Sequence, residues 1–479
     1  MDSCRSAPSR GAGIVSSADA ENARMLAHTL GLGVEEAAAL LRAEVLITGE
    51  SDRDSLVQRI AGLLAKTVQS VHTTPAPRDP DVEIVIGAAQ AATSASTLRL
   101  VLEPSRALLG TRVARPPSGA PPCHPWVELL LAALVAGGAV RLIVGRAFNL
   151  PFRDPAVIDF GAVIGADVGV LSERVDLGVA HLAGAGAVGT HFVRALSTFN
   201  VTGVLHVIDP DLVDGGNLNR CDFYEHEDVD RPKAEVLATR ARPLVPGLRL
   251  EPHVSRLQSL RTDGAWLQQL VVAVDSRRAR RGLQEEIPCD VFDASTTGIE
   301  EVVLHFNSRR TRGACLSCLY HEDPTEGAHE EHVARLLGVE RADLRVADGF
   351  ITADAERRII SRHPQLRERR LRGVAYDSLF KELCGAGTLG RDDGQQVLAP
   401  LAFVSALAGT LLAFEFVRRR RRRTVAEPFN EWHVSPWSQP LVSGWRQTPA
   451  RPSCTFCSRP HFVDTARTLW GTADGRNTT

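Results

Sequence analysis

The most constraining feature of the sequence is a glycine-rich turn between a short apolar strand and a helix. Residues 179–183 (VAHLA) lead into Gly184, Gly186 and Gly189, and a second strand, GVLHVID, then ends at Asp209. A first glycine permits the tight turn, a second lets backbone amides approach a nucleotide, and a third lets helix and strand pack closely. The helix N-terminus offers unpaired N–H groups to an anion, and the terminal acid can bind ribose hydroxyls. Taken alone, such a turn is typical of dinucleotide-binding proteins.

Length and charge narrow the class of protein. A chain of 479 residues suggests two or three domains. The formal net charge of −2 argues against a dedicated nucleic-acid or membrane-surface binder. The N-terminal segment MDSCRSAPSRGAG has no apolar core and so does not read as a secretory signal. We expect a cytoplasmic protein that binds neither membrane nor nucleic acid.

From about residue 150 strands and helices alternate. The short apolar runs are VAHLA, GVLHVID, LRLEPHV, LVVAVD and DVFDAS. This alternation predicts an α/β fold, a Rossmann-like and mostly parallel sheet with helices on both faces. Two longer apolar runs, 127–144 and 401–417, fall short of the roughly 20 residues of a membrane span and predict buried helices, the first continuing into a strand. The arginines 418–423 read as a solvated helix end, favoured by the helix dipole.

The chain divides into regions of different composition. Residues 1–125 read as a mixed region of unknown role, with helices over 17–72, and end in the proline-rich linker ARPPSGAPPCHP. One α/β domain is expected over 126–464, followed by a flexible polar tail over 465–479. Within that domain, 325–398 is charged and helical in character and reads as an insertion or crossover region.

The polar segment after Asp209 distinguishes an enzyme that transfers hydride from one that acts on a nucleoside triphosphate. Asn217, Arg220 and Lys233 follow the second strand closely, beside the helix N-terminus that accepts a phosphate. Fixed cations suit a triphosphate attacked at its α-phosphorus, because they stabilise the charge that grows on the phosphoryl oxygens and on pyrophosphate. Asp275 ends the strand LVVAVD, at the same edge of the sheet. A lone carboxylate beside phosphates is the usual way to hold Mg²⁺.

In this order, these residues resemble the ThiF/MoeB family, the prokaryotic relatives of ubiquitin-activating enzymes. The resemblance includes NLNR, RPKAEVLA and VVAVDSRRAR and extends through CLSC, LAPLAFVSALAGTLLAFEFV and CTFC. It implies ATP-dependent adenylation of the C-terminal carboxylate of a ubiquitin-like protein or peptide, a homodimer, and a downstream conjugating or sulfur-transfer partner. By that resemblance Asp209 binds the ribose, Asn217, Arg220 and Lys233 bind the phosphates, and Asp275 binds magnesium.

Two features depart from the family pattern. Glutamine usually follows the arginine of NLNR, where this chain has Cys221. Many members also take an arginine from the partner subunit, carried on a helix before the glycine turn. Arg153 and Arg174 are the candidates here, and neither lies in a recognisable motif.

Four of the nine cysteines form two CxxC pairs, Cys315 with Cys318 and Cys454 with Cys457. In a reducing compartment this spacing indicates a metal rather than disulfides. Each pair can bind a metal from one short turn, and both occur where the family carries them, so the sequence predicts a tetrathiolate zinc site. Four protein ligands leave no position for a substrate, and we therefore expect a structural zinc.

Cys384 lies in the segment ELCGAGTLG, ahead of the apolar run 401–417. Thioester-forming members of the family carry a cysteine in a similar segment before that helix, although the intervening stretch is longer here. A thiolate at this position can attack the acyl-adenylate and hold the substrate as a thioester. A buried or incidental thiol is an alternative of equal weight, because some relatives stop at the adenylate.

The leading hypothesis is therefore an adenylyltransferase that uses ATP, Mg²⁺ and Zn²⁺. An NAD(P)-dependent oxidoreductase on the same fold is one alternative, favoured by the glycine turn alone. A nucleotide-binding scaffold without turnover is the other, because no family motif surrounds the candidate arginines.

Overall fold

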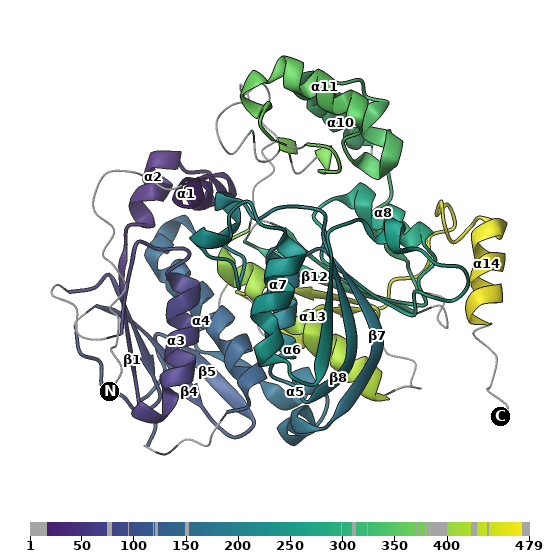
Figure 1. Cartoon of the computed structure of the whole chain (residues 1–479). Helices are drawn as coiled ribbons and strands as arrows, with labels where there is room; N and C mark the ends of the chain where they lie inside the picture. Colours follow the sequence, from purple (N-terminus) through teal and green to yellow (C-terminus); the bar gives the residue numbers. More distant parts are fainter. Residues whose placement is uncertain are drawn as a thin grey trace.

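The structure, a computed structural model, describes residues 17–471 apart from 74–78, 94, 118, 120–122, 149–152, 298, 309–312, 323, 370, 377–378, 381–382, 384–399, 423–428 and 438–439. This part of the chain forms two mostly parallel sheets with helices between and around them (Figure 1). The mixed α/β architecture confirms the predicted fold class.

The first sheet has the strand order β2-β1-β3-β4-β5-β6, parallel from β2 to β4 and antiparallel beyond. Its strands are β1 (Glu44–Gly49), β2 (Ser70–His72), β3 (Val82–Ile86), β4 (Ser96–Leu102), β5 (Arg106–Gly110) and β6 (Ala156–Asp159). The helices of this half are α1 (Ser17–Leu30), α2 (Val34–Leu40), α3 (Asp54–Leu64), α4 (Pro125–Val144) and α5 (Phe160–Ile164). Strands β1 and β2 interrupt the stretch 17–72, so the prediction of helices is wrong at both places. The apolar run of β1 lies between two helical stripes.

The second sheet has the order β14-β13-β12-β11-β10-β7-β8-β9. Its strands are β7 (Val175–Ala183), β8 (Val201–Ile208), β9 (Leu248–His253), β10 (Gln269–Val272), β11 (Asp290–Thr297), β12 (Glu301–Ser308), β13 (Glu431–Val434) and β14 (Trp445–Arg446). Its helices are α6 (Ala187–Leu196), α7 (Lys233–Ala241), α8 (Arg277–Glu285), α9 (Leu316–Leu319), α13 (Ala402–Arg422) and α14 (Pro460–Trp470). Strands β11, β10, β7, β8 and β9 are parallel and match the predicted runs. Their carboxyl ends therefore meet at one edge.

Two long apolar helices, α4 and α13, join the sheets. Helix α4 packs against the first sheet, α13 against the second, and the two helices contact each other. The indole Nε1 of Trp126 on α4 donates a hydrogen bond of 3.0 Å to the carbonyl oxygen of Thr410 on α13. One hydrophobic core therefore runs through both halves.

Both predicted apolar helices are confirmed as buried. Of the described helices, α4 alone is long and apolar enough to cross a membrane, and 72% of its apolar window is buried in this core. The strand expected at the end of the run 127–144 is wrong, because α4 stays helical through Val144.

The arginine-rich end of α13 differs from the solvated end that the sequence predicts. Glu415 is fully buried and accepts hydrogen bonds from Arg418 at 2.7 and 2.9 Å and from Arg419 at 3.1 Å. The Arg419 guanidinium also lies 4.2 Å from the ring centre of Phe306. The prediction is wrong for these two arginines, because a carboxylate buried within an apolar run requires charged partners.

The predicted insertion forms a small helical unit above α8 (Figure 1). It contains α10 (Pro324–Leu337), the 3₁₀ turn η8 (Asp343–Gly349) and α11 (Ala353–Arg362). Val333, Ile359 and other apolar side chains of this unit form a hydrophobic cluster separate from the main core. Its helical character is confirmed over the described residues.

Candidate functional site

The glycine turn connects β7 to α6 at the carboxyl edge of the second sheet. Gly184 has a φ of +102°, and a Cβ there would lie 2.6 Å from the carbonyl oxygen of Ala273. A Cβ at Gly189, on the first turn of α6, would lie 2.1 Å from the carbonyl oxygen of Gly184. Both positions therefore require glycine. At Gly186 no atom lies within 4 Å of a Cβ position, and its backbone borders open space.

A cleft of about 1200 Å³ opens over this edge of the sheet. Its lining brings together Gly184, Gly186, Asp209, Asn217, Arg220, Lys233 and Asp275. They come from the ends of three parallel strands and the segment that follows β8, which the parallel order places at one edge. Gly189 packs behind the turn, and Cys384 lies outside the described residues.

Asp209 follows β8 and is buried at this edge. Its carboxylate accepts hydrogen bonds from the backbone N–H groups of Ala185 at 2.7 Å and Asp211 at 2.8 Å. Burial raises the pKa of Asp209 to about 6, against the opposing effect of the Lys233 cation. The site therefore holds a carboxylate whose protonation changes between acid and neutral pH.

Lys233 begins α7, and its Nζ lies 3.2 Å from the Oδ2 of Asp211. Burial alone would lower the pKa of Lys233, but the carboxylates of Asp211 and Asp209 raise it above its ordinary value. Lys233 therefore remains a cation at the cleft at all physiological pH values.

The loop after β8 fixes Asn217 and Arg220 through its own hydrogen bonds. The Asp214 carboxylate accepts a hydrogen bond from the N–H of Asn217 at 3.1 Å, and Asn217 Oδ1 accepts one from the N–H of Asp214 at 3.2 Å. Arg220 Nη1 donates to the carbonyl oxygen of Gly216 at 2.6 Å. The reciprocal capping holds the Asn217 amide in the cleft lining, and the bond to Gly216 holds the Arg220 guanidinium there.

Helix α1, from the first half of the chain, also borders the cleft. Glu21 Oε2 lies 2.8 Å from Arg220 Nη1. One residue further, the Asn22 Oδ1 accepts a hydrogen bond of 2.9 Å from the side chain of Asn219. Sequence reasoning missed these residues, because α1 carries no motif and its partners lie almost 200 positions away.

A second contact from the same half supports this loop. Lys66 Nζ donates to the carbonyl oxygens of Leu218 at 3.1 Å and Cys221 at 2.7 Å. The Lys66 carbonyl in turn accepts a hydrogen bond of 2.7 Å from the side chain of Asn22. This loop, which carries Asn217 and Arg220 and is called the nucleotide loop after their predicted role, is thus held by groups from both halves of the chain.

Arg24, also on α1, lines the cleft. Among the described residues its guanidinium has no hydrogen-bond or ion-pair partner. Arg153 and Arg174, the candidates before the glycine turn, are exposed and do not line the cleft. Among the described residues, an arginine that lines the cleft and has no such partner, Arg24, therefore comes from the first helix of the same chain.

Asp275 lies between β10 and α8 and lines the cleft. The neighbouring backbone is fixed by Arg280, which bonds the carbonyl oxygen of Val274 and the buried Asp293. Tyr320 donates a further hydrogen bond of 2.6 Å to Asp293. An exposed carboxylate beside a fixed backbone, in the same cleft as the glycine turn, has the hard oxygen donor that Mg²⁺ prefers.

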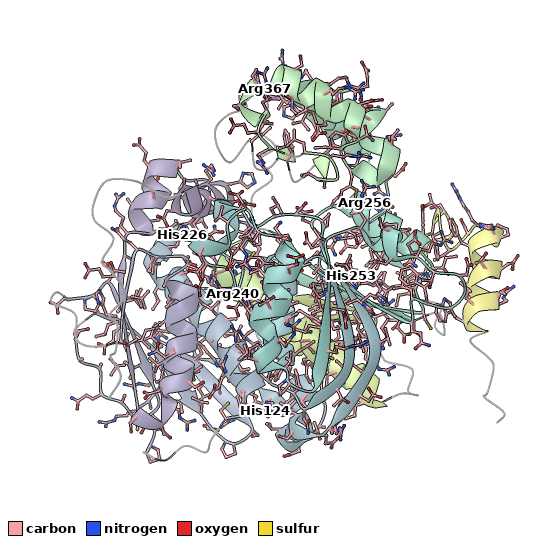
Figure 2. All side chains as sticks on the ribbon, viewed as in Figure 1. His124, His226, Arg240, His253, Arg256 and Arg367 are labelled. Carbon is pink, nitrogen blue, oxygen red and sulfur yellow. The ribbon has the colours of Figure 1, made fainter. Side chains whose placement is uncertain are left out.

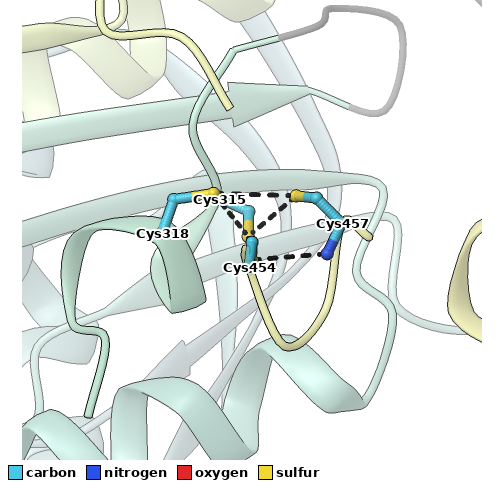
Figure 3. Close-up of side chains that lie close together, drawn as sticks. All are labelled: Cys315, Cys318, Cys454 and Cys457. Carbon is cyan, nitrogen blue, oxygen red and sulfur yellow. Dashed lines mark hydrogen bonds between the residues drawn. The ribbon is translucent and has the colours of Figure 1, made fainter. Parts of the chain in front are cut away.

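The two CxxC pairs meet (Figure 3), and none of the four cysteines lines the cleft. Their sulfurs are 3.7 Å apart for Cys315–Cys318 and Cys315–Cys454, 3.8 Å for Cys318–Cys457 and 3.2 Å for Cys457–Cys315. All four lie within 4.8 Å of one another. A tetrahedral zinc with bonds of about 2.3 Å requires sulfurs about 3.8 Å apart, and disulfide sulfurs lie at about 2.0 Å. The donor set therefore fits zinc.

Cys221 stands where the family carries glutamine, and it is buried. Burial raises the pKa of Cys221 to about 11. The thiol is therefore protonated at neutral pH and has little nucleophilic character.

Two family profiles match the chain. The ThiF family matches residues 176–446, and the E1 N-terminal domain matches residues 15–195. The first match covers the second sheet, the glycine turn and the predicted nucleotide residues. The second covers α1, the first sheet and the turn itself.

Individual relatives match over shorter stretches. The uncharacterized protein y4jF of Sinorhizobium fredii is 25% identical over 342 residues, which is 67% of this chain and 64% of that protein. The NEDD8-activating enzyme E1 catalytic subunit of Arabidopsis thaliana is 43% identical over 77 residues, 16% of each chain. The chain thus spans less than two thirds of the length of either relative. A crystal structure of E. coli MccB with ATP is 15% identical over 62% of this chain and 70% of that one, with a TM-score of 0.34.

Proposed function

The chain belongs to the ThiF family, and on that premise we propose that it adenylates the C-terminal carboxylate of a ubiquitin-like protein or peptide. The reaction joins the carboxylate to the α-phosphorus of ATP and releases pyrophosphate. The observation that carries the proposal is the single cleft lined by Asp209, Asn217, Arg220, Lys233 and Asp275 beside the glycine turn. The name of the Arabidopsis relative, an enzyme that activates NEDD8, supports the substrate class.

The assigned roles follow from position and charge. Asp209 accepts hydrogen bonds from the ribose hydroxyls at the end of β8. The open backbone at Gly186 and the N-terminus of α6 receive phosphate oxygens. Asn217, Arg220 and Lys233 stabilise the negative charge that grows as the carboxylate attacks and pyrophosphate leaves.

Asp275 is the residue assigned to magnesium. When bound there, Mg²⁺ neutralises part of the phosphate charge in the cleft. Arg280 fixes the backbone at Val274, the residue before Asp275, through the contact described above.

Arg24 is assigned a phosphate contact from within the same chain. It is a cation that lines the cleft and has no partner among the described residues, whereas Arg220 is paired with Glu21. On this proposal the arginine that many relatives take from a partner subunit is supplied by α1 in cis.

ATP–pyrophosphate exchange tests the proposal, with short glycine-ended peptides as carboxylate acceptors. Exchange should require Mg²⁺ and should fall about 100-fold in Asp275→Asn. Asp263→Asn is the matched control, because Asp263 is exposed and does not line the cleft. Exchange that survives in Asp275→Asn would remove this residue from its role, and NAD(P) binding in preference to MgATP would favour the oxidoreductase.

A further inference from the structure

The cleft extends beyond the nucleotide residues to the insertion. Its lining includes Glu330 on α10, Arg341 just before η8, Arg345 within η8, and Phe350 just after it. The guanidinium of Arg256, which follows β9 and is labelled in Figure 2, lies 3.7 Å from the ring centre of Phe350 and so joins the sheet edge to the insertion. A volume of about 1200 Å³ exceeds the roughly 300–1,000 Å³ of a single small-molecule site. The outer part can therefore hold something other than the nucleotide.

One carboxylate organises the outer wall. Glu330 Oε2 accepts hydrogen bonds from Arg341 Nε at 3.0 Å and from Arg345 Nε and Nη2 at 3.0 and 2.8 Å. Glu330 Oε1 lies 3.5 Å from Arg278 Nη1 on α8. Burial alone would raise the pKa of Glu330, but the hydrogen bonds from Arg345 and Arg341 lower it. Glu330 is thus an anion at neutral pH and fixes three guanidinium groups against the cleft.

This cluster has a surplus of positive charge. Three guanidiniums converge on the one carboxylate of Glu330, so positive groups outnumber the negative group that holds them. Arg277 and Arg281, also on α8, line the same end of the cleft and add to it. The carboxylates of Glu285 and Glu322 also line the cleft, and beside the glycine turn Glu21, Asp209, Asp211 and Asp214 face Arg24, Arg220 and Lys233. Cations therefore outnumber carboxylates at the outer wall but not beside the glycine turn, and the outer wall favours anions over cations.

We propose that the outer wall formed by Arg278, Arg341 and Arg345 selects substrates with acidic side chains just before the C-terminal carboxylate. This inference rests on the proposed function, because adenylation requires the substrate's C-terminus to reach the α-phosphate in the inner part of the cleft. The residues that precede that terminus must then pass the arginine wall. A tail rich in lysine or arginine is disfavoured at the same place, since like charges in a partly desolvated cleft cost affinity.

Two short synthetic peptides test the inference. They share one glycine-ended C-terminus and differ only upstream, where one carries aspartates and the other lysines at the same positions. We expect kcat/KM for ATP–pyrophosphate exchange to favour the acidic peptide by about tenfold or more, through KM, and the preference to shrink as salt is raised.

The double variant R341Q/R345Q should bring the ratio between the two peptides close to one while leaving the KM for ATP unchanged. Glutamine keeps a donor for Glu330, and the two arginines are 43% and 56% exposed in their side chains, so the fold should persist. R357Q/R367Q is the matched control: it removes the same charge from exposed positions of the insertion that do not line the cleft (Arg367 is labelled in Figure 2). This control should keep the acidic preference.

The outcomes separate the inference from the proposed function. Exchange with equal or reversed preference would overturn the arginine wall and leave adenylation standing. Calorimetry in the presence of a non-hydrolysable ATP analogue measures the affinity for each peptide when no exchange occurs. In this reverse case the parent chain binds the acidic peptide more tightly than the lysine peptide, and R341Q/R345Q loses that difference. That result would keep the wall and overturn adenylation. Neither binding nor exchange with either peptide would overturn both.

Discussion

The carboxylate of Glu21 lies 2.8 Å from the guanidinium of Arg220, so the first helix of the chain is ion-paired with the nucleotide loop of the second sheet. Both side chains are about four fifths buried, with exposed fractions of 20% and 18%. Removing either partner would therefore leave a poorly solvated charge. On the proposed function, the first half of the chain is therefore part of the nucleotide site.

We predict that Arg24→Gln lowers kcat for ATP–pyrophosphate exchange by about 100-fold, because the variant loses a cation at the phosphates. Thermal unfolding should change little, since the guanidinium has no partner among the described residues. Arg42→Gln is the control, because Arg42 is exposed after α2 and does not line the cleft. Equal exchange rates in both variants would show that Arg24 does not contact the reacting phosphates.

We predict that Lys66→Met loosens the nucleotide loop without unfolding the chain. The variant loses two charge-assisted hydrogen bonds, to Leu218 and Cys221, and such bonds contribute about 1.5–3 kcal/mol each. Hydrogen exchange of the peptide that covers 216–222 should become faster, and the affinity for MgATP should fall. Unchanged protection of that peptide would mean that the loop is held by its own capping hydrogen bonds alone.

The part of the site that sequence could predict is local in the chain. Asp209 and Asp275 end parallel strands, and Lys233 begins the helix after β8, so strand order alone brings these residues to one edge. The four cysteines of the predicted zinc site can be recognised from the spacing within their two CxxC pairs. Each of these features can be read from a short window.

The rest depends on packing between distant segments. Glu21 and Lys66 bond residues about 150–200 positions away, and α1 carries no motif that distinguishes it from an ordinary packing helix. The sequence likewise does not distinguish Glu330 from the other charged residues of 325–398, because its role depends on the contact of α10 with Arg278 on α8. Burial of Glu415 among apolar residues has the same origin, and it accounts for the error at the end of α13.

We predict that the purified chain contains one zinc ion and that Cys454→Ser loses it. The cysteines tie residues 315–318 to 454–457 within a small hydrophobic cluster, so metal loss should lower Tm by roughly 5–10 °C. Elemental analysis and thermal unfolding provide the measurements. Cys123→Ser should retain the metal, since Cys123 lies outside this cluster. A full zinc content in Cys454→Ser would contradict the tetrathiolate assignment.

We predict that Cys384 carries a substrate thioester, although it lies outside the described residues. With a peptide that supports exchange, a reductant-sensitive adduct should form on the parent chain and be absent from Cys384→Ala, while exchange itself continues. Cys221→Ser should keep the adduct, because burial raises the pKa of Cys221 to about 11 and leaves little thiolate. An adduct that persists in Cys384→Ala would place the thioester elsewhere or show that the adduct is not one.

We predict that nucleoside binding depends on pH through Asp209. Burial raises the pKa of this carboxyl from 3.8 to about 6, so protonation begins close to neutral pH. Adenosine is the probe of choice, because on the proposed function its ribose binds Asp209, and it carries no phosphate that would titrate in this range. If ribose hydroxyls bind the ionised carboxylate, affinity should be constant above pH 6 and fall about tenfold per pH unit below it. Calorimetry should show this slope in the parent chain and a flat profile in Asp209→Asn.

The stability of the same two proteins should change in the opposite sense. A raised pKa in the folded state means that Asp209 favours folding most below pH 3.8 and that this contribution is lost as pH rises through about 6. A difference of about two pKa units corresponds to about 3 kcal/mol. The free energy of unfolding of the parent, compared with that of Asp209→Asn, should therefore decline between pH 4 and 6 and then level off. If the free energies of unfolding of the parent and of Asp209→Asn change with pH in parallel, Asp209 titrates near its ordinary pKa. The loss of adenosine affinity at acid pH would then have to come from the protonation of another group.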